Sequence, residues 1–169
     1  TGLDTVVGHL DRPMLPAPPL IMAVEGSDIA DFFNEVQMSC SGAQLAATSL
    51  ANEVAGFPQI VRRRDVLTAY PYTNTLMVLR VTGTVLRRAM ERSADYFAID
   101  DEGRICVSDS FLKPKVEHYN YDYFAGVNYA IDISKPVGRR ITGLTYQGKA
   151  VKDSDEFTIC LNSYRASGA

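Results

Sequence analysis

Strand-like and helix-like segments do not alternate regularly along this chain of 169 residues, and their irregular order is what most constrains its fold. Residues 127–133, 141–146 and 157–161 have strand character and follow one another without a helix-like segment between them. A regular alternation would have predicted a doubly wound parallel sheet. The observed order instead predicts an α+β fold, with mixed sheets and flanking helices.

Two amphipathic helices are expected before that strand-rich region. The first begins after Ser27, a residue type that caps helices well, and ends at Gly42. Apolar residues recur in it at helical spacing, at Ile29, Phe32, Phe33 and Val36. The second begins after Thr82-Gly83 and continues to about Tyr96. Its expected inward face comprises Val85, Leu86, Ala89, Met90 and Ala94.

Short strands are expected around these helices. Residues 44–49 form one, and residues 75–81 form another that is rich in β-branched and aliphatic side chains. Residues 104–107 are a third. Gln147-Gly148-Lys149 lies between two strand-like stretches and predicts a hairpin turn, because glycine readily supplies a positive φ.

A chain of this length is expected to form one domain, with 46% hydrophobic residues available for its core. Residues 1–25 contain four prolines, a density that prevents a long helix. This stretch is predicted to be a linker or N-terminal extension, and an extended segment packed on the surface is the alternative. The domain then comprises residues 26–169. Its last strand, followed directly by a small-residue turn, indicates truncation at the C-terminal end.

Composition and charge exclude several classes of function. A formal net charge of −3 gives no electrostatic basis for binding duplex nucleic acid. No apolar run is long enough to span a membrane, and the first residues do not resemble a signal peptide. The three widely spaced cysteines, Cys40, Cys106 and Cys160, are expected to be small buried side chains and not a disulfide framework.

The sequence offers no catalytic residues and no metal site. Its two histidines, His9 and His118, lie outside any H-E-x-x-H or paired Asp-x-His pattern. It contains no G-x-S-x-G nucleophile elbow, no P-loop and no G-x-G-x-x-G motif. An enzyme that acts by itself is therefore not expected.

Two tyrosines are candidates for binding a planar ligand. Tyr72 and Tyr164 each lie in loop-like sequence beside a strand, and neither belongs to an apolar stripe. Aromatic rings in such positions can stack on a nucleobase, at about 1–3 kcal/mol per base. The amide of Asn74 can donate to and accept from a purine edge. Three further tyrosines are expected to be packing residues, namely Tyr119, Tyr121 and Tyr123.

Three spaced segments resemble one known family. They are Tyr70-Pro71-Tyr72-Thr73-Asn74-Thr75-Leu76 followed by Val81-Thr82-Gly83, the stretch 119–141, and Leu161-Asn162-Ser163-Tyr164-Arg165-Ala166-Ser167-Gly168. In this order they resemble the C-terminal domain of bacterial 5'-nucleotidases. The closer resemblance is to the 2',3'-cyclic-nucleotide 2'-phosphodiesterase/3'-nucleotidase branch. It covers most of the chain from about residue 27.

This resemblance implies a role in a larger hydrolase that is periplasmic, secreted or attached to the cell wall. An N-terminal metallophosphoesterase domain in cis, outside this chain, would bind two divalent metal ions and hydrolyse the phosphoester. The present domain needs no cofactor of its own. It would hold the nucleotide or nucleoside between Tyr72 and Tyr164, with Asn74 at the base. Further pocket residues implied by the resemblance are Ser49, Ser167 and Gly168.

The resemblance has one gap, and a second function stays open. Many 5'-nucleotidases carry an Asn-Gly-Gly-Gly-Ile-Arg motif where this chain reads Thr48-Ser49-Leu50-Ala51-Asn52-Glu53. The asparagine and arginine contacts of that motif therefore have no counterpart here. The alternative function is a non-catalytic interaction module on a cell surface, which the proline-rich start and the scattered tyrosines would suit.

Overall fold

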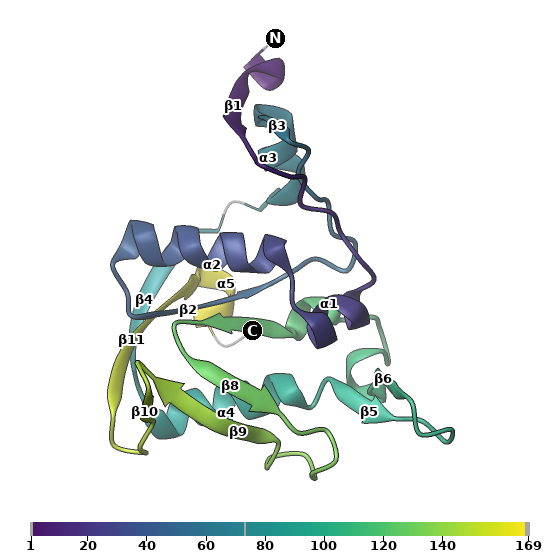
Figure 1. Cartoon of the computed structure of the whole chain (residues 1–169), viewed down its shortest axis with the longest axis vertical. Helices are drawn as coiled ribbons and strands as arrows, with labels where there is room; N and C mark the ends of the chain where they lie inside the picture. Colours follow the sequence, from purple (N-terminus) through teal and green to yellow (C-terminus); the bar gives the residue numbers. More distant parts are fainter. Residues whose placement is uncertain (1, 73, 168–169) are drawn as a thin grey trace.

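The computed structural model describes residues 2–72 and 74–167, and a four-stranded sheet lies at its centre (Figure 1). The strand order is β4 (Leu76–Thr82), β11 (Glu156–Asn162), β2 (Leu45–Ser49) and β7 (Asp122–Ala125). Strand β11 runs parallel to β2 and antiparallel to β4, and β2 is antiparallel to β7. The sheet is therefore mixed, and the predicted α+β class is confirmed.

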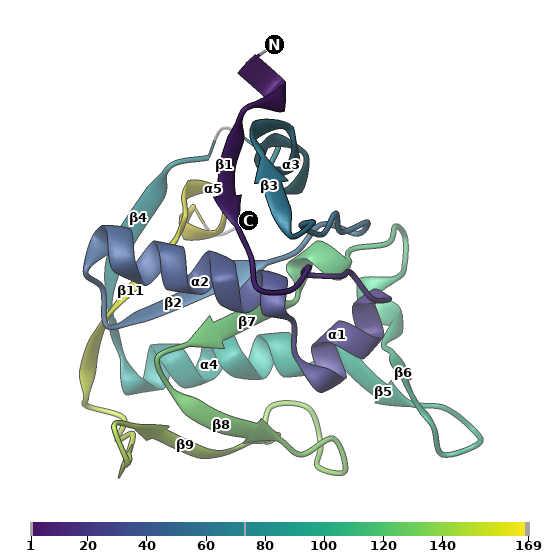
Figure 2. The same cartoon turned by 45° about the horizontal axis from the view of Figure 1, so that its top comes forward.

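Different elements cover the two faces of this sheet. Helix α2 (Asp28–Ser41) packs on one face, and α4 (Gly83–Ala94) lies on the other with a second sheet (Figures 1 and 2). The strands of the second sheet are β10 (Lys149–Ala150), β9 (Ile141–Tyr146) and β8 (Asn128–Ile131). Both sheets and α4 contribute to one apolar cluster, which includes Leu45, Leu86, Ile141 and Phe157.

Local capping residues set the starts of both long helices. The hydroxyl of Ser27 accepts a hydrogen bond from the backbone N–H of Ala30, and Gly42 takes the left-handed conformation after α2. The hydroxyl of Thr82 accepts from the backbone N–H of Val85 at the start of α4. Helix α4 ends two residues before the predicted position.

The buried faces of these helices differ from the expected apolar stripes. On α2, Phe32 and Val36 are exposed, whereas Asn34 and Gln37 are buried. The amides of these two residues donate to backbone carbonyl groups of β7 and β2, at 2.9 and 3.0 Å. Hydrogen bonding thus compensates for the burial of polar groups. On α4, Val85 and Ala89 are exposed, although both were expected on its inward face.

Two further pairs of strands are joined as hairpins. Strands β9 and β10 meet at Gln147 and Gly148, which both have positive φ (49° and 80°), as a type I′ hairpin turn requires. The predicted turn is therefore confirmed. Strands β5 (Phe97–Ile99) and β6 (Ile105–Val107) form the other hairpin, of which only β6 was predicted. Short 3-10 helices are η1 (Gly2–Asp4), η2 (Asp109–Phe111) and η3 (His118–Asn120).

The N-terminal segment pairs with and packs against later residues. Strand β1 (Val6–His9) pairs with β3 (Ile60–Arg62), next to α3 (Arg63–Ala69), at the top of Figure 1. Helix α1 (Pro19–Glu25) buries Met22 in a cluster with Phe57. Residues 2–25 thus form an extended, packed segment with one short α-helix, and a domain boundary at residue 25 stays a prediction.

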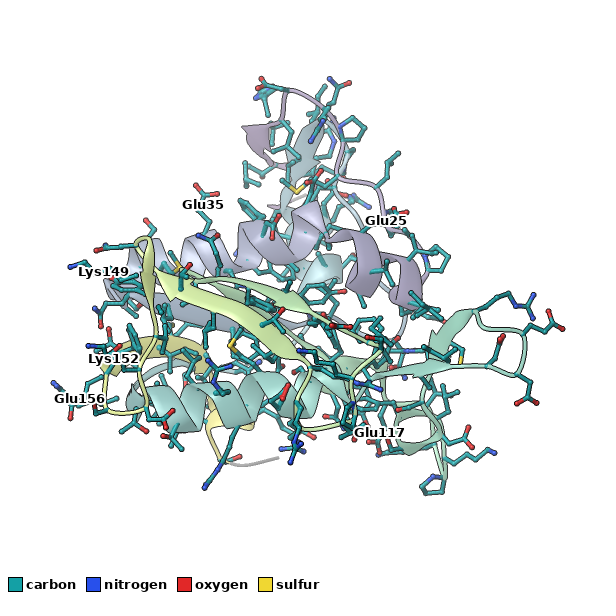
Figure 3. The ribbon with its side chains drawn as sticks, turned by 60° about the horizontal axis from the view of Figure 1, so that its bottom comes forward. Glu25, Glu35, Glu117, Lys149, Lys152 and Glu156 are labelled. Carbon is teal, nitrogen blue, oxygen red and sulfur yellow. The ribbon has the colours of Figure 1, made fainter. Side chains whose placement is uncertain are left out.

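The surface corrects one expectation about the cysteines. Cys160 is buried, but Cys106 is only partly buried and Cys40 is exposed, so the prediction of three buried thiols was wrong for Cys40. Charged side chains such as Glu35 and Lys149 extend away from the ribbon (Figure 3). Within residues 2–72 and 74–167, every helix is too short or too polar to cross a membrane.

Candidate functional site

A cavity of about 730 Å³ lies at one end of the four-stranded sheet. The strand directions explain its position, because this end gathers the residues that follow β2 and β11 and those that precede β4 and β7. Its size falls within the range of about 300–1,000 Å³ that is typical of small-molecule sites. The lining comes from residues 49–55, 68–72, Asn74, Tyr119, Asn162 and Tyr164, with Phe33 from α2.

Tyr72 stands on the cavity wall at the end of a chain of aromatic contacts. Its ring meets that of Tyr70 edge-on, with 6.3 Å between centroids, and Tyr70 meets Phe33 at 5.7 Å. Phe33 in turn meets Phe57, which is buried in the cluster beneath α2. Tyr72 itself is 58% exposed. Neighbouring rings therefore anchor it to the core and leave much of its surface free for a ligand.

Tyr164 reaches the same cavity from α5 (Ser163–Ala166), a short helix directly after β11. Asn162 caps this helix, since its side-chain oxygen accepts from the backbone N–H of Arg165 at 2.8 Å. The backbone N–H of Ser163 donates to the carbonyl of Thr75 at 2.8 Å, and the N–H of Thr75 donates to the Ser163 hydroxyl at 3.2 Å. These bonds join the start of α5 to the segment before β4, so the two candidate rings come from connected parts of the wall.

The structure brings four of the six predicted site residues to this cavity. Those in the lining are Ser49, Tyr72, Asn74 and Tyr164. Ser167 is not among the described lining residues, because its hydroxyl turns back and donates to the backbone carbonyl of Tyr164 at 2.8 Å. Gly168 lies outside the described residues. The binding roles of all six stay predictions.

Tyr119 is a lining residue that was wrongly predicted from the sequence to be a packing residue. It precedes β7 and lines the cavity, with the ammonium nitrogen of Lys115 at 5.9 Å from the centre of its ring. Tyr121 and Tyr123 do pack, with 4.9 Å between their ring centroids. No local signal separates Tyr119 from these neighbours, since its place depends on the pairing of β7 with β2.

The cavity wall combines aromatic rings with uncharged polar groups. Hydroxyl and amide groups come from residues such as Ser49, Thr68 and Asn162. Among the lining residues that the structure describes, Glu53 is the one carboxylate, and none is a lysine, arginine or histidine. Such a wall suits an uncharged planar ligand with polar edges.

The metal-binding side-chain types are dispersed in the described part of the chain. Across the described ranges, no three histidine, cysteine, aspartate or glutamate side chains gather in a way that could hold one. His118 instead serves packing, with its Nδ1 2.7 Å from the hydroxyl oxygen of Tyr96. Burial lowers the pKa of His118 below its usual value.

The sequence of this chain matches a known protein family. The family described as 5'-nucleotidase, C-terminal domain, matches residues 6–169. A 2',3'-cyclic-nucleotide 2'-phosphodiesterase/3'-nucleotidase of Haemophilus influenzae is 32% identical over 144 residues, which cover 76% of this chain and 22% of that protein.

Two solved structures of 5'-nucleotidases superpose on this chain. A Staphylococcus aureus protein described as a 5'-nucleotidase superposes with a TM-score of 0.92 at 38% identity, over 99% of this chain and 32% of the other. A 5'-nucleotidase precursor from Thermus thermophilus, at 15% identity, shares the fold with a TM-score of 0.72 over 98% of this chain and 31% of its own.

The chain therefore belongs to the 5'-nucleotidase C-terminal domain family, as its sequence predicted. It spans 22% of the length of the Haemophilus relative and 32% of the Staphylococcus structure.

Proposed function

We propose that this chain is the substrate-recognition domain of a nucleotide phosphohydrolase and that Tyr72 and Tyr164 hold the nucleobase between their rings. The observation that carries the proposal is that both rings line one cavity, although they come from distant parts of the sequence. Both have free surface for stacking, since they are 58% and 50% exposed. Asn74 lies in the same lining and supplies an amide for the edge of the base.

The charge of the wall supports binding of the nucleoside part of a nucleotide. A phosphate group would call for positively charged side chains or a metal ion, and the described lining residues include no arginine or lysine. The sugar and base are uncharged and match the hydroxyl, amide and aromatic groups present. The phosphate would therefore extend out of this cavity.

Hydrolysis is assigned in this proposal to an N-terminal metallophosphoesterase domain in the same polypeptide. By the family resemblance, two divalent metal ions would bind in that domain. The chain's share of the relatives' length leaves room for such a domain. By the same likeness, we infer that the whole protein works outside the cytoplasm, in the periplasm, secreted or attached to the cell wall.

Titration of the purified chain with adenosine tests the proposal. Binding is followed by tyrosine fluorescence and by NMR shifts, and thermal unfolding verifies that each variant is folded. Tyr72→Ala and Tyr164→Ala should each weaken binding by about 1–3 kcal/mol, the contribution of one stacked base. Tyr72→Phe and Tyr164→Phe should retain most of the affinity, because the flat ring remains.

A matched control removes a ring away from the cavity. Tyr146 lies on β9 and packs against Phe157 at 5.1 Å, so Tyr146→Ala should lower stability without changing affinity. The proposal is overturned if the folded chain binds adenosine equally well without either candidate ring, or does not bind it at millimolar concentration. A protein partner whose capture survives Tyr164→Ala would instead favour the interaction module.

A further inference from the structure

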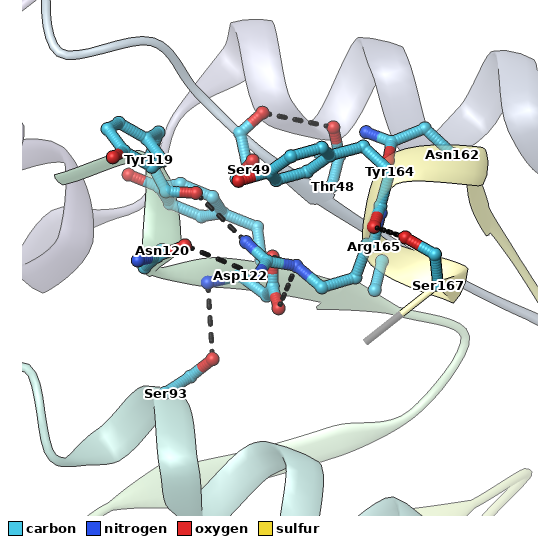
Figure 4. A network of polar contacts seen from close by, with 12 residues as sticks. Thr48, Ser49, Ser93, Tyr119, Asn120, Asp122, Asn162, Tyr164, Arg165 and Ser167 are labelled. Carbon is cyan, nitrogen blue, oxygen red and sulfur yellow. Dashed lines mark hydrogen bonds and ion pairs between the residues drawn. The ribbon is translucent and has the colours of Figure 1, made fainter. Parts of the chain in front are cut away.

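Arg165, the residue after Tyr164, connects two parts of the cavity wall (Figure 4). Its Nη2 donates to the backbone carbonyl of Tyr119 at 3.0 Å, and its Nη1 donates to the side-chain oxygen of Asn120 at 3.3 Å. Arg165 belongs to α5, whereas Tyr119 and Asn120 belong to η3, directly before β7. One guanidinium group therefore holds together the elements that carry Tyr164 and Tyr119.

The same guanidinium is also fixed to the sheet. Its Nε lies 3.2 and 3.1 Å from the two carboxylate oxygens of Asp122, the first residue of β7. Each of these two side chains is 15% exposed. The backbone N–H of Asp122 donates to the hydroxyl of Ser93 on α4 at 3.1 Å. None of Ser93, Asp122 and Arg165 is among the described lining residues, so the network supports the wall from behind.

We expect this ion pair to fix geometry more than to add stability. Burial raises the pKa of Asp122 above its usual value, and the attraction of Arg165 offsets this only in part. Buried pairs of this kind contribute little net stability, although removing one partner leaves the other charge uncompensated. A guanidinium offers several donors in a rigid fork, so it can hold three acceptors in fixed directions, which a lysine cannot do.

We propose that Tyr119 is a third wall of the pocket that contacts the bound nucleoside, and that Arg165 is a positioning residue that sets Tyr119 relative to Tyr164. The ligand in this statement rests on the function proposed above. The placement of Tyr119 is independent of that function. It follows from the cavity lining and from the hydrogen bonds that Arg165 donates across the wall. A pocket of fixed width between rings would bind a planar group without first ordering its own wall.

Adenosine titrations of variants test both parts of the proposal. Tyr119→Ala should weaken adenosine binding roughly five- to tenfold, the lower end of the range for a ring that stacks on a base, and Tyr119→Phe should bind nearly as well as the parent. Arg165→Met should weaken adenosine binding to a similar extent, although Arg165 itself does not line the cavity. Arg165→Lys should not restore it, because an ammonium group lacks the fork of donors.

Two further variants separate positioning from loss of folding. Asp122→Asn combined with Arg165→Met removes the pair without leaving a buried charge, so the chain should stay folded while its adenosine affinity stays low. Arg140→Met removes another guanidinium, on a residue that is 8% exposed, which donates to the carbonyls of Ala94, Phe97 and Lys135, away from the cavity. It should lower the unfolding temperature and leave the affinity unchanged.

A readout that needs no ligand completes the test. In chain labelled with 3-fluorotyrosine, Arg165→Met should shift the ¹⁹F signals of Tyr119 and Tyr164, which are assigned with Tyr119→Phe and Tyr164→Phe, and Arg140→Met should not. If adenosine binds the parent and needs Tyr164 but neither Tyr119 nor Arg165, the further inference alone is overturned. If adenosine does not bind at all, the proposed function and the contact by Tyr119 fail together. The ¹⁹F signals then still decide whether Arg165 positions the wall.

Discussion

His118 gives the clearest residue-scale prediction about pH. Its ring nitrogen lies 2.7 Å from the Tyr96 hydroxyl, and burial lowers its pKa from the usual 6.5. The usual pKa applies to the unfolded chain, and the lowered pKa applies to the folded chain. Between them, the unfolded chain therefore binds a proton at His118 more readily than the folded chain does. The free energy of unfolding should fall as the pH decreases from about 7 to 5.5, because the equilibrium shifts toward the state that takes up more protons. Urea unfolding at a series of pH values measures this.

The two histidines provide the control for this prediction. His118→Gln should flatten the pH dependence between 7 and 5.5, since the group that responds is gone. His9 is exposed, so His9→Gln should keep the slope of the parent chain. Equal slopes in all three proteins would contradict the assignment of this pH dependence to His118.

Gly83 makes an element-scale prediction about the start of α4. A Cβ atom at this position would collide with the backbone carbonyl of Lys152, and the backbone N–H of Gly83 donates to the carbonyl of Asp155 at 2.8 Å. Alanine usually favours a helix by about 1 kcal/mol over glycine. Here Gly83→Ala should instead lower the free energy of unfolding by about 1–3 kcal/mol, because two backbone segments must move apart. Urea unfolding checks the sign.

A second glycine tests whether close packing is the cause. Gly8 lies in β1, and a Cβ atom there would meet nothing within 4 Å. Gly8→Ala should therefore leave stability within about 0.5 kcal/mol of the parent, as a surface substitution does. If Gly83→Ala left the free energy of unfolding unchanged, residues 152–155 would be able to move aside at little cost.

The elements themselves could be predicted largely from local sequence, but their buried faces could not. Caps and turn residues act within a few positions, so Ser27, Thr82 and Gly148 located two helices and a hairpin. The buried face of α2 depends on tertiary hydrogen bonds, because Asn34 and Gln37 are buried only by virtue of carbonyl acceptors on β7 and β2. An apolar pattern does not contain that information.

At the scale of the whole molecule, the cavity follows from how strands pair. Tyr72 and Tyr164 could be proposed from their loop-like surroundings and from a resemblance, and the antiparallel pairing of β4 with β11 places both at one end of the sheet. Tyr119 could not be found this way. Its position requires β7 to pair with β2, with Ser49 opposite Asp122, and no short-range pattern predicts that pairing.

The N-terminal segment carries the last prediction, since it contributes to the core beneath the cavity. Leu10, Met14 and Met22 pack in the cluster that also holds Leu50 and Phe33. Both Leu50 and Phe33 line the cavity. Deletion of residues 1–25 should therefore lower the free energy of unfolding by at least about 3 kcal/mol, because the loss of one buried methionine side chain alone costs about 2–5 kcal/mol. Urea unfolding measures this.

The same deletion should also weaken adenosine binding, since it withdraws packing from the side chains behind the pocket wall. Met22→Ala removes one buried side chain of this segment and should reproduce part of the stability loss. Deletion of residues 1–5 removes mainly η1 and should lower the free energy of unfolding much less. A stability unchanged by deletion of residues 1–25 would show that this stretch is a linker, as the sequence first predicted. A loss of stability without a loss of affinity would show instead that the pocket wall is held by α2 and the sheet alone.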